Sequence, residues 1–203
     1  MSERENGLNK IKVVRWDGQD QYYLPFESET YVAGPTTNPD FETVKLRYYY
    51  NAMTSPYAIK EFDMETKKES ILKEQEVLGS TFDKKNYRSK RVWATARDGK
   101  KVPISMVYHK STPLNGSSPL LLYAYGSYGS TIDPYFSSVR LSLLDRGFIY
   151  AIAHIRGGEY LGRPWYEEGR LFQKKNTFTD FVDRSNFLIA EGYTSPEHLY
   201  AMG

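Results

Sequence analysis

One tyrosine in this sequence stands where a side chain could take part in a reaction. Residues 120–125 read Leu-Leu-Leu-Tyr-Ala-Tyr, a run typical of a buried strand, and Tyr125 is its last member. Ligands of α/β sheets bind beyond the carboxyl ends of strands, so the Tyr125 hydroxyl could donate a hydrogen bond to a bound molecule. The alternative is a tyrosine that only ends a buried strand, and the spacing alone favours that alternative.

An arginine and two glycines follow the next apolar run, residues 148–155. Gly157 and Gly158 have a sufficient structural reason, because a tight turn after a strand needs such residues. The guanidinium of Arg156 either binds a peptide carboxylate or pairs with an acid of the same chain. Of these two alternatives we favour the pairing with an acid.

Other reactive side chains are few or scattered. The three histidines are His109 at a strand end, His154 in a buried run and His198 after a turn, and we expect none beside a serine or a pair of carboxylates. The chain has no cysteine, which removes disulfides, cysteine nucleophiles and thiolate zinc sites. No metal-ligand spacing or phosphate-binding glycine loop occurs, so we expect neither a metal nor a cofactor.

The composition indicates a soluble globular protein that binds neither nucleic acid nor membranes. Among 203 residues, 27 Lys and Arg balance 25 Asp and Glu for a net charge of +2, and no block of like charge stands out. No apolar run approaches the ~20 residues of a membrane helix. The first residues, MSERENGLNK, lack the apolar centre of a signal peptide. We therefore expect a cytoplasmic protein.

The elements before about residue 88 are predicted to be short strands between turns. The dipeptide Asp17-Gly18 predicts a hairpin between residues 11–16 and 22–26. Frequent turns without a long helix favour a sandwich or a propeller blade, and the strands are too few for a complete propeller. The further strands are expected at residues 45–50, 59–64 and 69–73.

The pattern changes after residues 79–86, a polar stretch that we interpret as a linker. Asp98-Gly99 predicts a second hairpin, between residues 91–96 and 102–109. Strands and helices then alternate, which predicts a parallel α/β sheet. The expected elements are a strand at 120–125, a helix at 136–145 ended by Gly147, a strand at 148–155, a helix at 177–191 capped by Thr177 with Asp180 and ended by Gly192, and a strand at 199–202.

Three segments of the chain resemble one known family. Residues 120–129 (LLLYAYGSYG), 153–166 (AHIRGGEYLGRPWY) and 176–203 resemble the prolyl oligopeptidase family of α/β-hydrolases. Residues 91–110 and Asn176-Thr177-Phe178 are most similar to its oligopeptidase B branch. The resemblance implies that residues 89–203 are the N-terminal part of the parallel sheet of an α/β hydrolase fold with its helices, and that residues 1–88 are the closing part of a β-propeller with a linker.

The resemblance also assigns roles to side chains. In this family a tyrosine hydroxyl is one of the donors to the oxyanion of acyl transfer, and Tyr125 matches that residue. With this match, the oxyanion role becomes the better hypothesis for Tyr125. Tyr128 matches an aromatic residue of the substrate pocket, and Arg156 matches a substrate-binding position in the loop at the edge of the active site. Glu159 stands one position earlier than the acid of the family motif.

The end of the sequence carries the last expectation. Gly203 matches the first glycine of the G-x-S-x-G nucleophile elbow, so the serine, and after it the aspartate and histidine, would lie beyond this chain. We expect a fragment that is inactive by itself. The intact protein is expected to be a serine endopeptidase that hydrolyses short peptides, after Arg or Lys, through an acyl-enzyme. The alternatives are a non-catalytic peptide-binding module and an esterase-type α/β-hydrolase.

Overall fold

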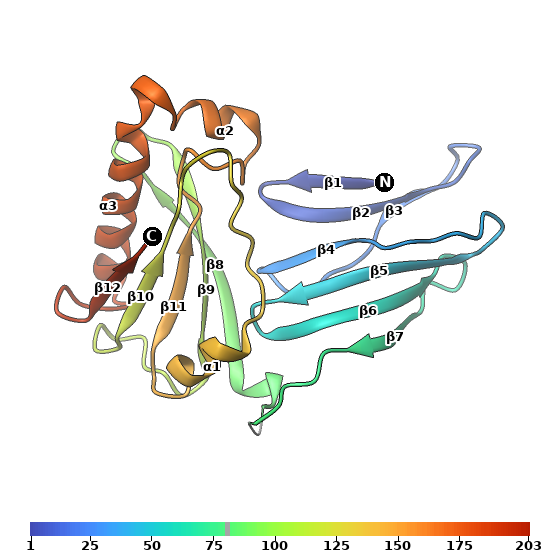
Figure 1. Ribbon diagram of the computed structural model, residues 1–203, viewed down its shortest axis with the longest axis horizontal. Helices are drawn as coiled ribbons and strands as arrows, with labels where there is room; N and C mark the ends of the chain where they lie inside the picture. The colour runs from blue at the N-terminus through green and yellow to red at the C-terminus, as the bar shows by residue number, and fades with distance from the viewer. Residues whose placement is uncertain (80–81) are drawn as a thin grey trace.

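Two antiparallel sheets stand beside a mixed α/β sheet in the computed structural model, which describes residues 1–79 and 82–203 (Figure 1). The predicted linker at 79–86 includes residues 80 and 81, which lie outside the described ones. Its later part is the short 3-10 helix η1 (Lys84–Asn86), in which the Asp83 side chain accepts a hydrogen bond from the Lys85 amide.

The first two sheets consist of short antiparallel strands. The predicted hairpin around Asp17-Gly18 is confirmed, because its two strands pair from Lys12↔Tyr23 to Val14↔Gln21. The strands of the first sheet are β1 (Ser2–Glu5), β2 (Leu8–Val14) and β3 (Gln21–Tyr23). Those of the second, in spatial order, are β4 (Tyr31–Pro35), β5 (Lys45–Ala52), β6 (Ser55–Asp63) and β7 (Glu69–Glu74).

An aromatic core joins these two sheets. Ile11 of β2 packs in one cluster with Tyr31, Tyr48 and Phe62 of the four-stranded sheet, and each is at most 5% exposed. Side chains alternate between the two faces of a strand, so one face of β5 is committed to this core. Burial of aromatic and aliphatic side chains therefore holds β1–β3 against β4–β7.

The third sheet has five strands in the order β12-β10-β11-β9-β8. Strand β10 pairs in parallel with both β11 and β12, whereas β9 is antiparallel to β11 and to β8. The three strands predicted to be parallel are parallel, and the predicted hairpin at Asp98-Gly99 is confirmed. This hairpin joins the same sheet, with β9 antiparallel to β11. The bounds are β8 (Tyr87–Thr95), β9 (Lys101–His109), β10 (Leu120–Tyr123), β11 (Ile149–Ala153) and β12 (Leu199–Met202).

Helices cover both faces of this sheet (Figure 1). On one face, Leu188 of α3 packs with Leu120 and Leu122. On the other, Leu144 of α1 packs with Ile152. Two short elements were not predicted, α2 and the 3-10 helix η2. The bounds are α1 (Ser138–Leu144), α2 (Arg163–Glu167), η2 (Leu171–Gln173) and α3 (Lys175–Ala190).

The predicted start of the long helix is wrong, whereas its end is confirmed. Helix α3 begins at Lys175, so Thr177 and Asp180 lie inside it and neither caps it. Both side chains bond instead to groups outside the helix. Gly192 ends α3 with a positive φ of 72°, and Gly147 ends α1 with a φ of 86°, as the sequence predicted.

Polar contacts attach the N-terminal sheets to the α/β part. The Arg4 guanidinium bonds to the Asp133 carboxylate at 2.8 Å. The Asn51 side chain accepts a hydrogen bond from the Phe136 amide at 2.6 Å. Gly7, with a φ of 85°, lies directly against the ring of Tyr160, where a Cβ would come within 2.1 Å of a ring carbon. The turn between β1 and β2 therefore packs against the loop that follows β11.

Candidate active site at the carboxyl ends of the parallel strands

Three parallel strands end side by side, and a cavity of about 390 Å³ lies beyond their carboxyl ends, against α3. The Ala124 amide, just past β10, donates to the Met202 carbonyl at the end of β12 at 3.1 Å. Most of the wall is apolar, and the cavity opens to solvent. The lining residues are Ala124, Tyr125, Ile155, Thr177, Phe178, Phe181, Val182, Ala201, Met202 and Gly203.

Tyr125 supplies the phenol on this wall. Its side chain is 43% exposed, and among the described residues its hydroxyl has no hydrogen-bond partner. Gly126 follows with a φ of 63°, and a Cβ there would come within 2.5 Å of the Thr177 methyl group. Only glycine therefore allows the chain to turn away directly after Tyr125 while α3 stays close.

Tyr128 and Arg156, the other two predicted site residues, lie away from this wall. Within residues 1–79 and 82–203 neither of them lines the cavity. Tyr128 is 87% exposed and has a φ of 56°, unusual for a residue with a side chain. It lies in the turn closed by the hydrogen bond from the Ser130 amide to the Ser127 carbonyl.

The Arg156 guanidinium is buried among acids of the same chain. Its Nη2 lies 2.7 Å from Asp180, its Nη1 lies 2.7 Å from Asp98, and the Arg156 amide donates to Asp180 at 3.0 Å. Burial opposes the charged form, but the hydrogen bonds that the guanidinium donates to Asp180 and Asp98 outweigh it and raise the pKa of Arg156. The structure therefore has the pairing with an acid that the sequence favoured, and a substrate-binding role for Arg156 stays a prediction.

The expectation that no histidine lies beside a serine is wrong. His154 Nε2 lies 2.8 Å from Ser105 Oγ, because His154 directly follows β11, which pairs with the strand β9 that carries Ser105. The His154 ring stacks on Tyr160 at 3.5 Å. Burial, with Arg91 and Arg4 nearby, holds the pKa of His154 well below its ordinary value. Among the described residues no histidine lines the cavity, so His154 is a buried core group.

Two residues that the sequence analysis missed hold the chain next to Tyr125. The Lys174 ammonium donates to the Gly126 carbonyl and to the Ser127 hydroxyl, both at 2.6 Å. Thr177 Oγ1 lies 2.9 Å from the Arg156 carbonyl and 3.4 Å from that of Gly126. These partners stand 21 to 51 positions apart in the sequence, so no local pattern points to them.

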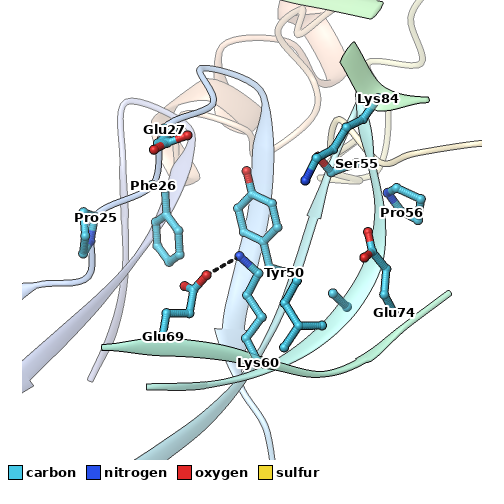
Figure 2. A pocket seen from close by; sticks show the side chains of 12 residues that line it. Pro25, Phe26, Glu27, Tyr50, Ser55, Pro56, Lys60, Glu69, Glu74 and Lys84 are labelled. Carbon is cyan, nitrogen blue, oxygen red and sulfur yellow. Dashed lines mark hydrogen bonds and ion pairs between the residues drawn. The ribbon is translucent and has the colours of Figure 1, made fainter. Parts of the chain in front are cut away.

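A second cavity, of about 370 Å³, lies in the N-terminal half between residues 25–27 and β5–β7 (Figure 2). Figure 2 shows Lys60 and Glu69 paired across it, with Tyr50 beside them. The ammonium of Lys60 is 2.6 Å from Glu69 and 4.6 Å from the centre of the Tyr50 ring. These charges are engaged with each other, and we therefore place the candidate site at the strand ends.

Residues 1–79 and 82–203 contain neither a candidate metal site nor a candidate membrane-spanning helix. No three His, Asp or Glu side chains there gather closely enough to hold a metal ion. Nor does any helix in these ranges combine the length and apolar character needed to cross a membrane.

Comparisons with known proteins agree with this geometry. The prolyl oligopeptidase family matches residues 134–203. Dipeptidyl aminopeptidase BI of Pseudoxanthomonas mexicana is 46% identical over 100% of this chain and 28% of its own length. Protease 2 of Moraxella lacunata is 38% identical, with 98% of this chain and 29% of its own length covered. The chain thus spans less than a third of these relatives.

Solved structures extend the likeness to the fold. Oligopeptidase B from Trypanosoma brucei, with covalently bound antipain, is 40% identical with a TM-score of 0.85, over 98% of this chain and 29% of that one. Oligopeptidase B from Leishmania major is 34% identical with a TM-score of 0.84, over the same shares. The chain belongs to the prolyl oligopeptidase family, and oligopeptidase B enzymes are among the structures that it resembles.

Proposed function

We propose that the whole protein is a serine peptidase that hydrolyses short peptides through an acyl-enzyme, and that this chain supplies an oxyanion donor, Tyr125. The observation that carries the proposal is the position of the Tyr125 phenol, free of hydrogen bonds to the described residues, on the wall of an apolar cavity beyond three parallel strand ends. Donors so placed act where charge develops during acyl transfer.

The proposed chemistry divides the work between this chain and the rest of the protein. A base takes the proton of the serine hydroxyl as the oxygen adds to the peptide carbonyl carbon, and the carbonyl oxygen becomes an anion that accepts a hydrogen bond from Tyr125. The intermediate then expels the amine, which takes that proton from the protonated base, and water hydrolyses the acyl-enzyme to the acid and the free serine. We propose that the serine, the base and the acid come from outside these 203 residues, and that the chain alone is inactive.

The specificity is a separate part of the proposal. The relatives differ in name: identity is 40% to the T. brucei oligopeptidase B structure, 46% to dipeptidyl aminopeptidase BI and 34% to a prolyl endopeptidase of Elizabethkingia meningoseptica. The proposed cleavage after Arg or Lys therefore rests on the oligopeptidase B resemblance. Tyr128, exposed beside the candidate site, is proposed to contact the substrate. Arg156 is proposed to contribute to substrate binding by holding the loop after β11 in place.

The division into domains completes the proposal. Residues 1–88 are proposed to close a β-propeller that limits access to short peptides, and residues 89–203 to begin the α/β-hydrolase domain. A four-stranded antiparallel sheet such as β4–β7 has the size of one propeller blade, which supports this assignment. Peptides of increasing length with one cleavage sequence should then be cut at falling rates.

The experiment is Tyr125→Phe in the whole protein, which keeps the ring and removes only the donor. Loss of one oxyanion donor typically lowers kcat by about a hundred- to a thousandfold. Tyr57→Phe is the matched control, since Tyr57 has a similar exposure, 41%, in the remote sheet. The measurements are kcat, KM and Tm with peptides that carry Arg, Lys or Pro before the scissile bond, and with an activated ester.

The outcomes separate the alternatives. A Tyr125→Phe enzyme within about threefold of wild-type kcat would refute the oxyanion role. If the hydroxyl were purely structural, its loss would change only the stability of the fold, by about 1 kcal/mol. Ester hydrolysis without peptide hydrolysis would indicate the esterase. Peptide binding without cleavage by the whole protein would indicate the non-catalytic module.

A further inference from the structure

The peptide group between Gly126 and Ser127, one residue after Tyr125, is held from several directions. The Gly126 carbonyl accepts a hydrogen bond from Lys174 at 2.6 Å, and a Cβ on Gly157 would come within 2.1 Å of the same oxygen. Three residues on, the Gly129 amide donates to the Gly157 carbonyl at 3.0 Å. The turn that leaves Tyr125 is therefore clamped between the loop after β11 and the start of α3.

Lys174 is the charged member of this clamp, and its position is otherwise unfavourable. It stands at the N-terminus of α3, where the helix dipole disfavours a cation. Burial also lowers the pKa of its ammonium. Its side chain nevertheless turns toward the strand ends and bonds to both the Gly126 carbonyl and the Ser127 hydroxyl. These two contacts account for a lysine at this position.

We propose that Lys174 is a positioning residue for the oxyanion donor: by fixing the Gly126 peptide, its ammonium sets the direction in which the Tyr125 phenol enters the cavity. The inference rests on the proposed function, because it gives Lys174 a catalytic consequence only through Tyr125. It names a residue that does not line the cavity and does not touch the reacting atoms.

The physical reason is that Gly126, which Lys174 holds, is the next residue in the chain after Tyr125. The held carbonyl belongs to the peptide group between Gly126 and Ser127, which only the φ and ψ of Gly126 separate from the peptide group that follows Tyr125. When the Gly126 carbonyl is released, these two torsions are free to change, the Tyr125 backbone can turn, and the hydroxyl at the far end of the ring moves further than the backbone does. An error of about 1 Å in the placement of a reacting or donating group can cost about a hundredfold in rate. Without Lys174, the Gly126 carbonyl keeps only the distant Thr177 hydroxyl, at 3.4 Å.

The test compares Lys174→Met, Lys174→Arg and Lys175→Met in the whole protein. Methionine keeps the length of the side chain and removes the donors, whereas arginine keeps a charged donor. Lys175 is exposed on the same helix end and is the matched control. Lys174→Met is expected to lower kcat by about ten- to a hundredfold, while KM stays within about threefold. Lys174→Arg should recover most of the loss, and Lys175→Met should have no effect.

A double variant decides whether Lys174 acts through Tyr125. Once Tyr125→Phe has removed the donor, Lys174→Met should lower kcat by no more than about twofold further, because the two residues act as a unit. Independent, multiplicative losses would overturn the inference, as would a single variant with normal kcat. A normal Tyr125→Phe enzyme would instead refute the oxyanion role itself.

Hydrogen exchange in the 203-residue chain supplies a readout that needs no activity. The amide of Gly129, bonded to Gly157 across the clamp, should exchange at least about tenfold faster in Lys174→Met than in Lys175→Met or the wild type. Amides in the middle of α3 should not change. Equal exchange at Gly129 in all three chains would show that Lys174 does not hold the turn, and the inference would fail even if the whole protein proved inactive.

Discussion

The four-stranded sheet and the α/β sheet use their charged side chains in different ways. In the four-stranded sheet the ion pairs repeat contacts that strand pairing has already made. Arg47 and Glu61 are register partners on β5 and β6, and their side chains bond at 3.3 Å. Lys60 pairs with Glu69 across the next two strands. Cross-strand neighbours of opposite charge add modestly to a ladder that exists without them.

In the α/β part the charges join segments that no backbone ladder connects. Arg156 links the loop after β11 to α3 through Asp180, and to the β8–β9 turn through Asp98. These partners are 24 and 58 residues away in sequence, and the Asp180 side chain is 0% exposed. Near the candidate site, position is thus set by buried charges between loops.

This difference between the two sheets indicates which acidic side chains are needed for the stability of the fold. An acid on a strand whose cationic partners are exposed can lose its charge while the strand stays paired, because those partners remain hydrated. A buried acid between loops cannot, because its removal leaves an uncompensated cation. Asp180 and Glu61 represent the two cases, and their variants test the comparison.

The largest effect is expected for Asp180→Asn. The variant keeps the shape of the side chain but leaves the buried Arg156 with Asp98 as its main counter-charge. Breaking a buried ion pair typically costs 3–5 kcal/mol, and we expect about 3 kcal/mol because Asp98 still holds the guanidinium. Urea unfolding of the 203-residue chain, followed by circular dichroism and by Trp fluorescence, gives the free energy of unfolding.

The control for this variant is Glu168→Gln. Glu168 also approaches Arg156, at 3.6 Å, but it is more exposed and outside hydrogen-bond distance. It should change the free energy of unfolding by less than about 1 kcal/mol. If Asp180→Asn were no more destabilising than Glu168→Gln, burial of the Arg156–Asp180 pair would add nothing to stability. That result would contradict the proposed difference between the α/β part and the four-stranded sheet.

Local signals in the sequence predicted much of the fold, and the misses have physical reasons. The dipeptides Asp17-Gly18 and Asp98-Gly99 each specify a turn by themselves, so both hairpins were found. Strand β4 was missed because it ends in Gly34-Pro35, which have little strand propensity. The five residues of α2, with a proline among them, are too few to show a helical period.

The candidate site was predictable only where one segment carries it. Tyr125 was identified because its strand, its glycine and the family motif are contiguous. The Arg156–Asp180 pair was not identified, because Thr177-x-x-Asp180 has the spacing of a capping box and that local pattern competes with a contact made across the fold. Lys174 carries no local signal, since its two partners are almost fifty residues away and one of them is a backbone carbonyl.

An intermediate effect is expected from the buried histidine of the α/β part. Its surroundings are Ser105, Tyr160, the Ile132 carbonyl and the guanidinium groups of Arg91 and Arg4, so the folded state favours the neutral ring. The unfolded chain binds a proton on His154 near its ordinary pKa of 6.5, and the folded chain does not. Stability should therefore fall as pH falls below that value, by up to about 1.4 kcal/mol per pH unit.

The measurement is the free energy of unfolding between about pH 7.5 and 5.5, above the range in which carboxylates titrate. The variant is His154→Gln, whose amide can still bond to Ser105 but does not titrate. Its stability should be less sensitive to pH than that of the wild type. His109→Gln is the control for the removal of a histidine as such, because His109 lies in an exposed hydrogen bond with Ser111. Parallel pH profiles for wild type and His154→Gln would show that His154 already accepts its proton in the fold.

The smallest effect is expected for Glu61→Gln. Hydrogen bonds from Lys45 come first among the contacts that hold the pKa of Glu61 below its ordinary value of 4.5. A depressed carboxylate pKa stabilises the fold above that value, and this contribution is lost as pH falls through the lower pKa of the folded state. The variant should therefore be slightly less stable than the wild type near pH 7, and equal to it in acid.

Salt should shrink this difference in stability, because Lys45 and Arg47, the two cations that contact Glu61, are solvent-exposed. At neutral pH the loss should be no more than about a quarter of that caused by Asp180→Asn, since β5 and β6 stay paired through their backbones. A loss as large as that of Asp180→Asn, unchanged by salt, would mean that charges hold the four-stranded sheet together as firmly as they hold the loops beside Tyr125.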